Sequence, residues 1–425
     1  MRLRDWNKNL KIRLGAEALV NITFWMFFPF LAIYFTDSFG KNMAGMLLIL
    51  SQVFAVAANL MGGYCADRFG RKRMMVISAV GQGVFFVLFA FANSPWYESP
   101  LVGFICFTVV SIFGSFYWPA SQAMVADVVE EKHRNDVFAV FYTSINIAVV
   151  IGPILGGIFY ADYRFELLLA SGLLCILLGA VLSKYIDETA PSLQNTAIAG
   201  KNSNWLSFLK NQIYEYGIIV KDRTFLLFIV AGVLAAQTFM QLDLLIPVYT
   251  KEVIEEQTLF SLRTWSFSLE GEKAFGLLIS ENGFLVALFT IVISRWMSTF
   301  RERNVFVASS IIYGVSIFAM GQTGLLWGLI LAMAFFTLAE LMTAGIQNGF
   351  ISKLAPEQMR GQYFAAASLR FTIGRMVAPL SIPMTDMIGF GWTFGILALL
   401  AFSSAGLYFI MYNRFDKMEA VKAAG

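Results

Sequence analysis

The chain has 425 residues, of which 58% are hydrophobic and 14% are charged, and its mean hydropathy is +0.68. An ordinary soluble domain carries about 25% charged residues, so this chain has too few polar residues to cover a water-soluble core. These values argue against a soluble enzyme, a disordered chain and a nucleic-acid-binding protein. The apolar stretches are continuous and do not alternate, which argues against a membrane β-barrel.

Twelve apolar stretches have lengths suited to membrane-spanning helices, which need about 20 mostly apolar residues. They are 15–36, 45–65, 74–93, 101–125, 137–160, 165–186, 225–249, 275–297, 304–321, 324–350, 362–384 and 388–412. The N-terminal arm has no cleavable signal pattern, and the first stretch is long enough to remain as a span. The sequence therefore predicts an all-α integral membrane protein with twelve transmembrane helices.

The distribution of basic residues indicates the topology. With twelve spans both termini lie on one side, and 24 of the 31 Lys and Arg residues fall on that side, against five on the other. By the positive-inside rule, we expect both termini to be cytoplasmic.

The longest connection on the cytoplasmic side is polar and divides the chain into two halves. We expect an N-terminal six-helix bundle at 1–186, a cytoplasmic linker at 187–222 and a C-terminal six-helix bundle at 223–425. A short amphipathic helix is expected within the linker, near Trp205–Val220. A second connection, Lys251–Ala274, is acidic and is expected to face outside.

The two halves carry a weak internal repeat. The pattern Arg-x3-Phe-Ala begins at Arg134 and again at Arg360, and a proline follows each arginine after 19 residues, at Pro153 and Pro379. The matches occur at equivalent topological places, which suggests duplicated halves. Parallel halves with substrate bound between them are a transporter architecture.

The loop between spans two and three reads Gly-Tyr-Cys-Ala-Asp-Arg-Phe-Gly-Arg-Lys-Arg, from residue 63 to residue 73. Its glycines permit a tight turn and a close helix approach, and Asp67 could lie against a helix N-terminus. Arg68 and Arg71 could pair with Asp127 at the end of span four. Such ion pairs could form a conformational latch, although a basic turn that only follows the positive-inside rule is the simpler alternative. The residues of the expected latch are Gly63, Asp67, Arg68, Gly70, Arg71 and Asp127.

This loop resembles the signature G-x-x-x-D-R-x-G-R-[KR] of the major facilitator superfamily. The resemblance covers the whole chain, and it implies the major facilitator fold, with two pseudo-symmetric bundles of six helices. It also implies a multi-pass protein of the cell membrane, in a bacterium the plasma membrane.

Span five contains a glycine-rich pattern, Gly152-Pro153-x2-Gly156-Gly157, preceded by Ala148. Small residues let a second helix pack closely and proline kinks a helix, so an ordinary packing seam is one interpretation. The pattern also resembles the antiporter motif G-x3-G-P-x2-G-G of drug:proton exchangers. Span four lacks the arginine that drug exporters often carry there.

The chain most resembles the LmrP type of multidrug antiporters within this superfamily. The segments that carry the resemblance are Asn9–Gly15, Gln241-Leu242-Asp243 with Pro247, and Thr337–Glu340. In that type, acids in spans seven and ten carry protons and contact cationic drugs, and Asp243 and Glu340 match those positions. The acid that the type has in span five is absent here, where Phe141 and Tyr142 stand.

Membrane burial supports the same two acids independently, because a charge at bilayer depth costs roughly 2.5–3.5 kcal/mol and usually faces a cavity or a partner. Asp243, Glu340, Arg370 and Arg375 all lie ~12–20 Å from the cytoplasmic end of their spans. Surroundings that alternate between wet and dry let an acid bind and release protons. The alternative is a static cluster in which Arg375 pairs with Glu340. Arg370 could be a counter-ion or could contact an anionic lipid or substrate.

The substrate pocket is expected to be apolar and aromatic, because aromatic faces attract cations and Met adapts its shape. Arg13 and Glu17, four residues apart, are interpreted as a pair on a helix surface. The candidate substrate-binding residues are Asn21, Trp25, Phe28, Tyr117, Trp118, Tyr142, Asn146, Met240 and Gln241, together with Arg370 and Arg375.

The sequence thus predicts a secondary transporter, not an enzyme, that exports amphiphilic or cationic compounds in exchange for protons by alternating access. ATP hydrolysis is not indicated, because the pattern G-x4-G-K-[ST] is absent. The expected partners are a small amphiphilic substrate, protons and membrane lipids, without nucleic acid, cofactor or metal, and the chain is expected to be a monomer. The alternatives are a carrier of an anionic metabolite, siderophore or lipid, and a non-transporting membrane sensor or assembly factor.

Overall fold

The computed structural model describes residues 6–190, 222–262, 265–344, 346–354 and 360–424. The chain forms two compact units, Met1–Ser203 and Asn204–Gly425. The boundary between them, most of the expected linker and the amphipathic helix expected near Trp205–Val220 lie outside the described residues.

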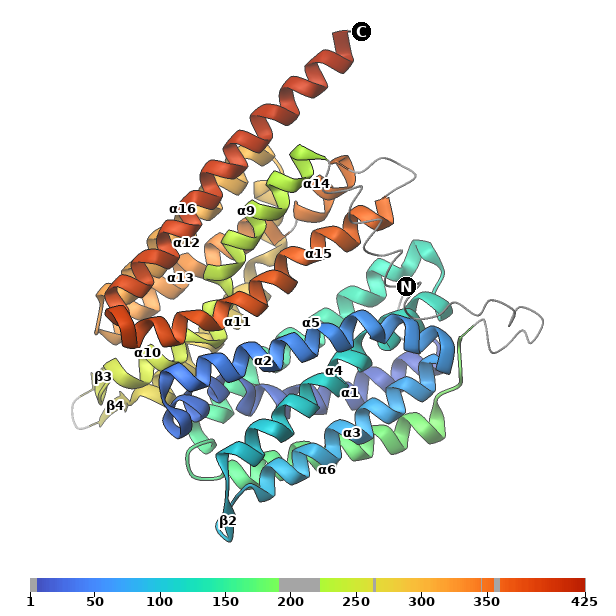
Figure 1. Cartoon of the computed structure of the whole chain (residues 1–425), viewed down its shortest axis with the longest axis vertical. Coiled ribbons are helices and arrows are strands. Elements are labelled where there is room, and N and C mark those ends of the chain that lie inside the picture. The colour runs from blue at the N-terminus through green and yellow to red at the C-terminus, as the bar shows by residue number, and fades with distance from the viewer. Residues whose placement is uncertain (1–5, 191–221, 263–264, 345, 355–359, 425) are drawn as a thin grey trace. The chain divides into compact units, whose positions relative to one another are not determined.

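The first unit is a bundle of helices that run back and forth along one direction (Figure 1). A short antiparallel hairpin, β1 (Asn93–Ser94) with β2 (Tyr97–Glu98), joins its third helix to its fourth. Its helical elements are α1 (Lys8–Phe27), the 3-10 turn η2 (Phe28–Phe30), α2 (Leu31–Phe69), α3 (Arg71–Phe91), α4 (Pro100–Val128), α5 (Glu131–Phe159) and α6 (Arg164–Tyr185).

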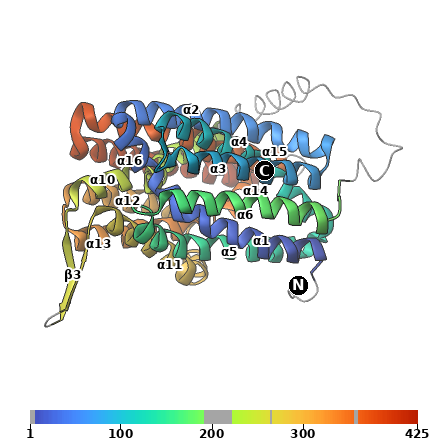
Figure 2. The ribbon, with the colours of Figure 1, turned by 90° about the horizontal axis from the view of Figure 1, so that it is seen from below.

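The second unit has a similar bundle, with one longer hairpin, β3 (Gln257–Leu262) with β4 (Trp265–Leu269). Figure 2 shows this hairpin projecting beyond the ends of the helices. The helical elements are α9 (Arg223–Phe239), η3 (Met240–Asp243), α10 (Leu245–Val253), α11 (Gly271–Met297), α12 (Glu302–Gln322), α13 (Leu326–Ala344), α14 (Gln347–Leu354), α15 (Arg360–Val377), η5 (Ala378–Leu380) and α16 (Ser381–Ala424).

Two glycines divide the longest helical stretches into pairs of spans. Gly40 interrupts α2 with a φ of 76°, and Gly389 interrupts α16 with a φ of 79°, a backbone conformation that favours glycine. The described chain contains ten helical segments long and apolar enough to cross a membrane, and two of them, of 62 and 53 residues, contain these breaks. Counting each of the two as a pair gives the twelve predicted spans.

The core of each unit lies between its helices and is apolar. In the second unit it is strongly aromatic: Phe228, Phe306 and Phe350 pack against one another with Tyr408 and Tyr412. The hairpin β3–β4 was not expected, because the acidic connection after span seven was predicted only as an outward loop. Its alternating apolar residues, such as Phe260 and Phe267, are the pattern of a strand.

Candidate functional site

Span five packs closely on span one through two of the predicted motif glycines. A Cβ atom on Gly152 would lie 2.5 Å from Trp25 Cβ, and one on Gly156 would collide with the carbonyl oxygen of Met26. Pro153 lies inside α5, which continues through it. The pattern therefore forms a tight seam between α1 and α5, in which larger residues could not be accommodated without movement.

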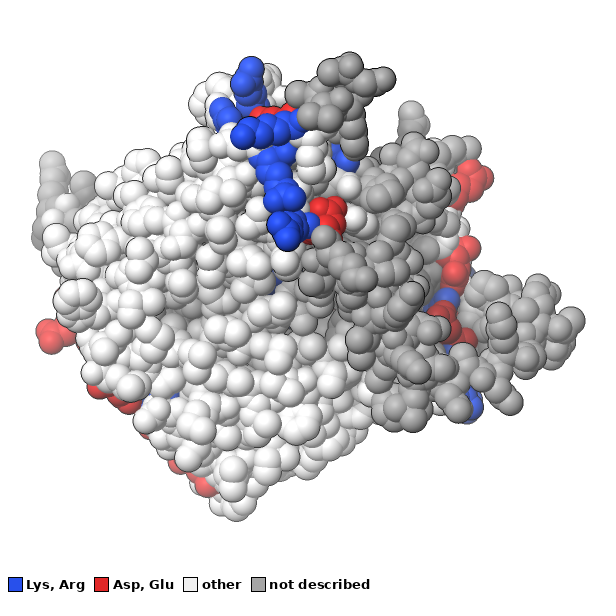
Figure 3. All heavy atoms as spheres, turned by 45° about the horizontal axis from the view of Figure 1, so that its top comes forward, with Lys and Arg blue, Asp and Glu red and all other residues white. Residues whose placement is uncertain are grey.

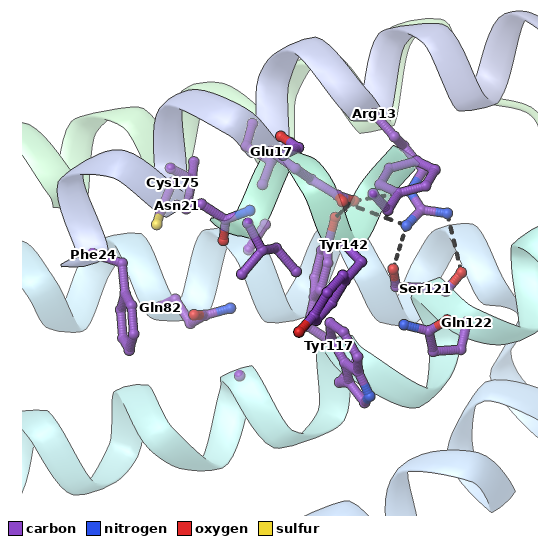
Figure 4. A pocket seen from close by; sticks show the side chains of 18 of the residues that line it. Arg13, Glu17, Asn21, Phe24, Gln82, Tyr117, Ser121, Gln122, Tyr142 and Cys175 are labelled. Carbon is purple, nitrogen blue, oxygen red and sulfur yellow. Dashed lines mark hydrogen bonds and ion pairs between the residues drawn. The ribbon is translucent and has the colours of Figure 1, made fainter. Parts of the chain in front are cut away.

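The helices of the first unit form an open cavity of about 570 Å³, which we call the N-cavity. Figure 4 shows its polar residues directed toward one another from several helices. Four predicted pocket residues, Asn21, Tyr117, Trp118 and Tyr142, line it together with Phe24 and Phe141. Trp25 and Asn146 are not among its lining residues; Trp25 packs against Gly152 instead.

A buried ionic network occupies one end of the N-cavity (Figure 4). Arg13 is only 2% exposed, and its Nε lies 2.8 Å from Glu17 Oε1. Arg13 also donates to the carbonyl oxygen of Ser121 at 3.0 Å and to its hydroxyl, while the Tyr117 hydroxyl donates to Glu17 Oε1 at 2.5 Å. The prediction of a pair on the helix surface was therefore wrong. The four-residue spacing identifies the partners, but it does not reveal that α4 covers them.

Three of the expected latch residues, Asp67, Arg71 and Asp127, contact one another within the first unit. Arg71 is the central cation: its Nη1 lies 2.5 Å from Asp67 Oδ1, and its Nε lies 3.3 Å from Asp127 Oδ2. Arg68 instead donates to the hydroxyl of Tyr64, one turn away on the same helix, at 2.6 Å. Arg71, and not Arg68, therefore joins the end of α2 to the end of α4.

Two details of this loop differ from expectation. The N-terminus of α3 is occupied by Glu188, whose carboxylate accepts from the backbone N–H of Arg71 at 2.8 Å, where Asp67 had been considered. Gly70 makes the turn with a φ of 102°, but Gly63 is helical and a Cβ there would meet no atom within 4 Å. Only one of the two glycines is therefore required by the conformation of the chain.

In the second unit, span seven is broken at the predicted acid. Helix α9 ends at Phe239, a 3-10 turn carries Asp243, and Leu244 has non-helical angles (φ −120°, ψ −77°) before α10 begins. The Oδ1 atom of Asp243 is buried, and Asp243 forms no hydrogen bond or ion pair with any described residue. The C-terminal end of a helix carries partial negative charge, so the carboxylate and the half-helix end both favour a cation at this place.

The second predicted acid, Glu340, lies on α13 and is held by the neighbouring α11. The amide nitrogen of Asn282 donates to Glu340 Oε2 at 3.0 Å and to the Thr337 hydroxyl at 3.0 Å. Glu340 is therefore oriented by a neutral donor, the amide of Asn282, which does not neutralise a negative charge on the carboxylate.

Glu340 and Arg370 line one cavity of about 190 Å³, which we call the C-cavity. Arg370 is 3% exposed, and its Nε donates to the carbonyl oxygen of Ala367 at 2.8 Å. With its amide turned so that the oxygen faces the guanidinium, Gln347 accepts from both Nη atoms at 2.5 and 3.1 Å. The guanidinium stacks on Phe228 at 4.4 Å. Arg370 is thus stabilised by neutral groups and does not pair with Glu340.

Arg375 is exposed and remains electrostatically coupled to Asp243. Within the described residues no ion pair joins Arg375 to Glu340, so the static cluster considered from the sequence is not what the structure contains. The described acids of this region, Asp243 and Glu340, therefore have no directly bound cation.

A third membrane acid was missed in the sequence. Glu281 lies ten residues after the start of α11, about 15 Å along the helix. Its Oε2 atom is buried, and within the described chain it has no hydrogen-bond partner. The sequence could have revealed Glu281, because it is an acid inside the apolar stretch 275–297. A charge at bilayer depth is costly and usually functional, which is the rule that identified Asp243 and Glu340.

The predicted pocket residue Gln241 is committed to holding two helices together. Fully buried, it donates to the carbonyl oxygens of Gln237 at 2.8 Å and Ala378 at 3.4 Å, and it accepts from the Ser381 hydroxyl at 2.6 Å. Gln241 therefore ties the break in span seven to the break at η5. Neither Gln241 nor Met240 is among the residues that line the C-cavity.

The hairpin β3–β4 is tied to the beginning of the helix that carries Glu340. Gln257 donates to the carbonyl oxygen of Gly324 at 2.7 Å and accepts from the backbone N–H of Leu326 at 2.8 Å. Trp327 donates to the carbonyl oxygen of Leu259 at 3.1 Å. The hairpin follows α10 directly, so it connects the ends of the two spans that carry Asp243 and Glu340.

Known proteins resemble the chain from end to end. Residues 14–269 match the Major Facilitator Superfamily. A Na(+), Li(+), K(+)/H(+) antiporter of Planococcus maritimus is 56% identical over 418 residues, which are 98% of this chain and 99% of that protein. The chain belongs to the major facilitator superfamily. The predicted family, the all-α membrane fold and the assignment as a transporter and not an enzyme are thereby confirmed.

More distant relatives of this superfamily member agree on the fold. The Multidrug resistance protein MdtH of Salmonella typhimurium is 24% identical over 388 residues, covering 90% of this chain and 86% of that protein. A POT family transporter solved in complex with 5-aminolevulinic acid matches with a TM-score of 0.76 at 16% identity, over 95% of this chain and 96% of that one. The chain is thus a multi-pass secondary transporter of this superfamily.

Proposed function

We propose that the protein exchanges monovalent cations, alkali cations above all, for protons across the membrane. The observation that carries this proposal is the break in span seven, which places Asp243, whose buried Oδ1 has no hydrogen-bond partner among the described residues, beside the C-terminal end of α9. Unwound backbone and half-helix C-terminal ends within the membrane are sites where transporters coordinate Na⁺ and protons. A small cation fits this geometry without a large pocket.

The exchange follows from competition at carboxylates. A carboxylate in the membrane binds either a proton or a cation, because an uncompensated charge at that depth is costly. When both are ionised, Asp243 and Glu340 repel each other, and a positive charge bound at one carboxylate weakens the attraction of the other for a second positive charge, so a proton and a cation compete. We propose that protons entering from outside displace the exported cation as the protein alternates between its open states. Each proton moved down 100 mV contributes about 2.3 kcal/mol.

The relation to the Planococcus maritimus antiporter supports this choice of substrate. That protein is described as an antiporter of Na⁺, Li⁺ and K⁺ against protons, and the identity of 56% extends over nearly the whole of both chains. At such similarity we expect a shared substrate class.

A second candidate function is the export of amphiphilic organic cations, as predicted from the sequence. The N-cavity supports it, because about 570 Å³ with aromatic walls is a size and composition that suits a drug-sized molecule. The more distant relation to a multidrug resistance protein points the same way. The anionic-substrate alternative has less support, since Arg370 already donates to Ala367 and Gln347.

The test is proton movement in everted membrane vesicles with an established pH gradient, followed with acridine orange after addition of NaCl, LiCl or KCl. We expect each salt to dissipate the gradient with the wild type and none to do so with Asp243→Asn or Glu340→Gln. Asp162→Asn and Glu166→Gln are matched controls, because both acids are exposed in the first unit. Undiminished exchange in both site variants would remove these carboxylates from the mechanism. Dissipation by ethidium but by no alkali salt would favour the second function.

A further inference from the structure

The second unit has a surface hollow of about 730 Å³ between α9 and α16, away from both acids. We call it the terminal groove. Its apolar part is formed by Leu227, Phe409 and Ile410, with Met418 at its far end, and its polar part by Asn413, Arg414 and Lys417. It lies at the end of the bundle from which α16 extends beyond the other helices (Figure 1). By the distribution of basic residues, this is the end expected to be cytoplasmic.

Along one face of α16, the groove is apolar on the side nearer the middle of the helix bundle and basic on the side nearer the C-terminus. Ile410 and Arg414 are four residues apart, and so are Phe409 and Asn413, so each polar residue lies one turn beyond an apolar one. Phe409 and Ile410 are exposed at 48% and 55%. On the opposite wall, Arg223 lies one turn beyond Leu227. This order matches the polarity of a phospholipid.

Basic side chains gather at the end of the terminal groove, and no described acid forms an ion pair with them. Arg414 and Lys417 are exposed, and neither forms a hydrogen bond or ion pair with any residue that the structure describes. Arg303 reaches the same rim, donating to Asn413 Oδ1 at 2.9 Å, with its guanidinium 5.4 Å from the Phe409 ring. Figure 3 shows Lys and Arg side chains gathered at one end, with Asp and Glu side chains between and beside them, above a broad surface that is almost without charge.

The acids on the neighbouring elements do not neutralise this rim. Glu302 pairs with Lys353 at 2.5 Å, and Asp222 accepts from the backbone N–H groups that begin α9 and from the Tyr363 hydroxyl. Asp416 lies on α16 between Arg414 and Lys417 in sequence, but two residues along a helix from Arg414, which places it on a different face. Counting only the residues that the structure describes, the groove therefore presents net positive charge.

We infer that the terminal groove binds an anionic phospholipid, with the phosphate at Arg414, Lys417 and Arg303 and an acyl chain along Leu227, Phe409 and Ile410. Basic pockets between membrane helices on the cytoplasmic side bind anionic headgroups. A free phosphate would use the basic rim alone and leave the exposed aromatic and aliphatic wall unexplained. The wall and the rim together fit a lipid, whatever substrate the transporter carries.

The test is native mass spectrometry of the purified full chain with phosphatidylglycerol and, separately, phosphatidylcholine. We expect phosphatidylglycerol to bind, and the variant R414Q/K417Q to bind it about 30-fold more weakly, the factor that corresponds to about 1 kcal/mol for each basic group. R414K/K417R keeps both charges and should bind as the wild type does. K184Q/R295Q removes one Lys and one Arg that are exposed at other helix ends, and it should have no effect.

A separate variant tests the apolar wall. Ile410→Ser shortens the contact with the acyl chain and should weaken phosphatidylglycerol binding without changing the binding of inorganic phosphate. Equal binding of phosphatidylglycerol and phosphatidylcholine, or equal loss in R414Q/K417Q and K184Q/R295Q, would overturn the inference. Competition by inorganic phosphate alone at the same concentration would assign the rim to free anions and overturn it as well.

Discussion

The N-cavity of the first unit and the membrane acids of the second treat buried charge in opposite ways. In the N-cavity, Arg13, Glu17, Tyr117 and Ser121 satisfy one another, so the charges cancel inside the unit. In the second unit, Arg370 is stabilised by neutral groups, while buried oxygens of Asp243 and Glu281 lack partners in the described chain. Burial alone is thus a poor guide to function. The informative feature is a buried charge whose partner is missing, because that place is open to a proton or a cation.

The largest effect on stability is expected from breaking the buried ion pair between Arg13 and Glu17. Glu17→Ala leaves the guanidinium of Arg13 buried without its carboxylate, which should destabilise the first unit by about 3–5 kcal/mol. Thermal unfolding in detergent would measure it. The double variant R13M/E17L removes both charges and should recover most of the loss. A single variant as stable as the wild type would mean that the network is not buried as described.

Packing gives a second contrast, within the first unit. Gly156→Ala would place a methyl group against the Met26 carbonyl and should cost about 1–3 kcal/mol in stability. Gly63→Ala enters open space within a helix and should be neutral or stabilising by up to about 1 kcal/mol. Thermal unfolding of the two variants side by side decides the matter. The reverse order would contradict the seam between α1 and α5.

Glu281 tests the role of the acids in the second unit that have a buried oxygen without a described hydrogen-bond partner. Glu281→Gln removes a membrane carboxylate without disturbing any hydrogen bond of its Oε2 atom. We expect alkali cation/proton exchange to fall about tenfold, equivalent to about 1.4 kcal/mol of lost cation attraction, with thermal stability unchanged. Rates in proteoliposomes at several Na⁺ concentrations would show the change. Unaltered exchange would restrict the cation path to Asp243 and Glu340.

The smallest effect is expected at the hairpin. Gln257→Ala removes two hydrogen bonds to the start of α13, each worth about 0.5–1.5 kcal/mol. The hairpin should exchange its backbone hydrogens faster, and transport should slow by roughly two- to five-fold. Hydrogen–deuterium exchange reports the first change. Thr258→Ala, which alters the exposed hairpin without touching α13, is the control, and an equal response in both variants would separate the hairpin from the transport cycle.

Much of this organisation could be predicted from the sequence because membrane insertion imposes simple rules. Apolar length gave the twelve spans, and charges inside apolar stretches identified Asp243 and Glu340. The same rule identifies Glu281, which was overlooked. The positive φ angles of Gly40 and Gly389 break the helices at these two residues. Nothing in the sequence distinguishes them from helical glycines such as Gly63.

The remaining features depend on tertiary contacts that spacing does not encode. Arg13 and Glu17 have the spacing of a surface pair, and only the packing of α4 against α1 buries them. Gln241 is polar, as a ligand-binding residue would be, but its amide already donates to the carbonyl oxygen of Ala378 and accepts from the Ser381 hydroxyl. The choice of Glu188 over Asp67 at the start of α3 likewise needs the path of the chain after α6.

The most direct test of the central proposal is proton release from the purified protein in weakly buffered detergent solution when an alkali salt is added. The account predicts that NaCl displaces protons from the wild-type protein, while choline chloride does not, and that Asp243→Asn combined with Glu340→Gln releases none. Equal release from that double variant, or no release from the wild type with Na⁺, Li⁺ or K⁺, would contradict exchange at these carboxylates.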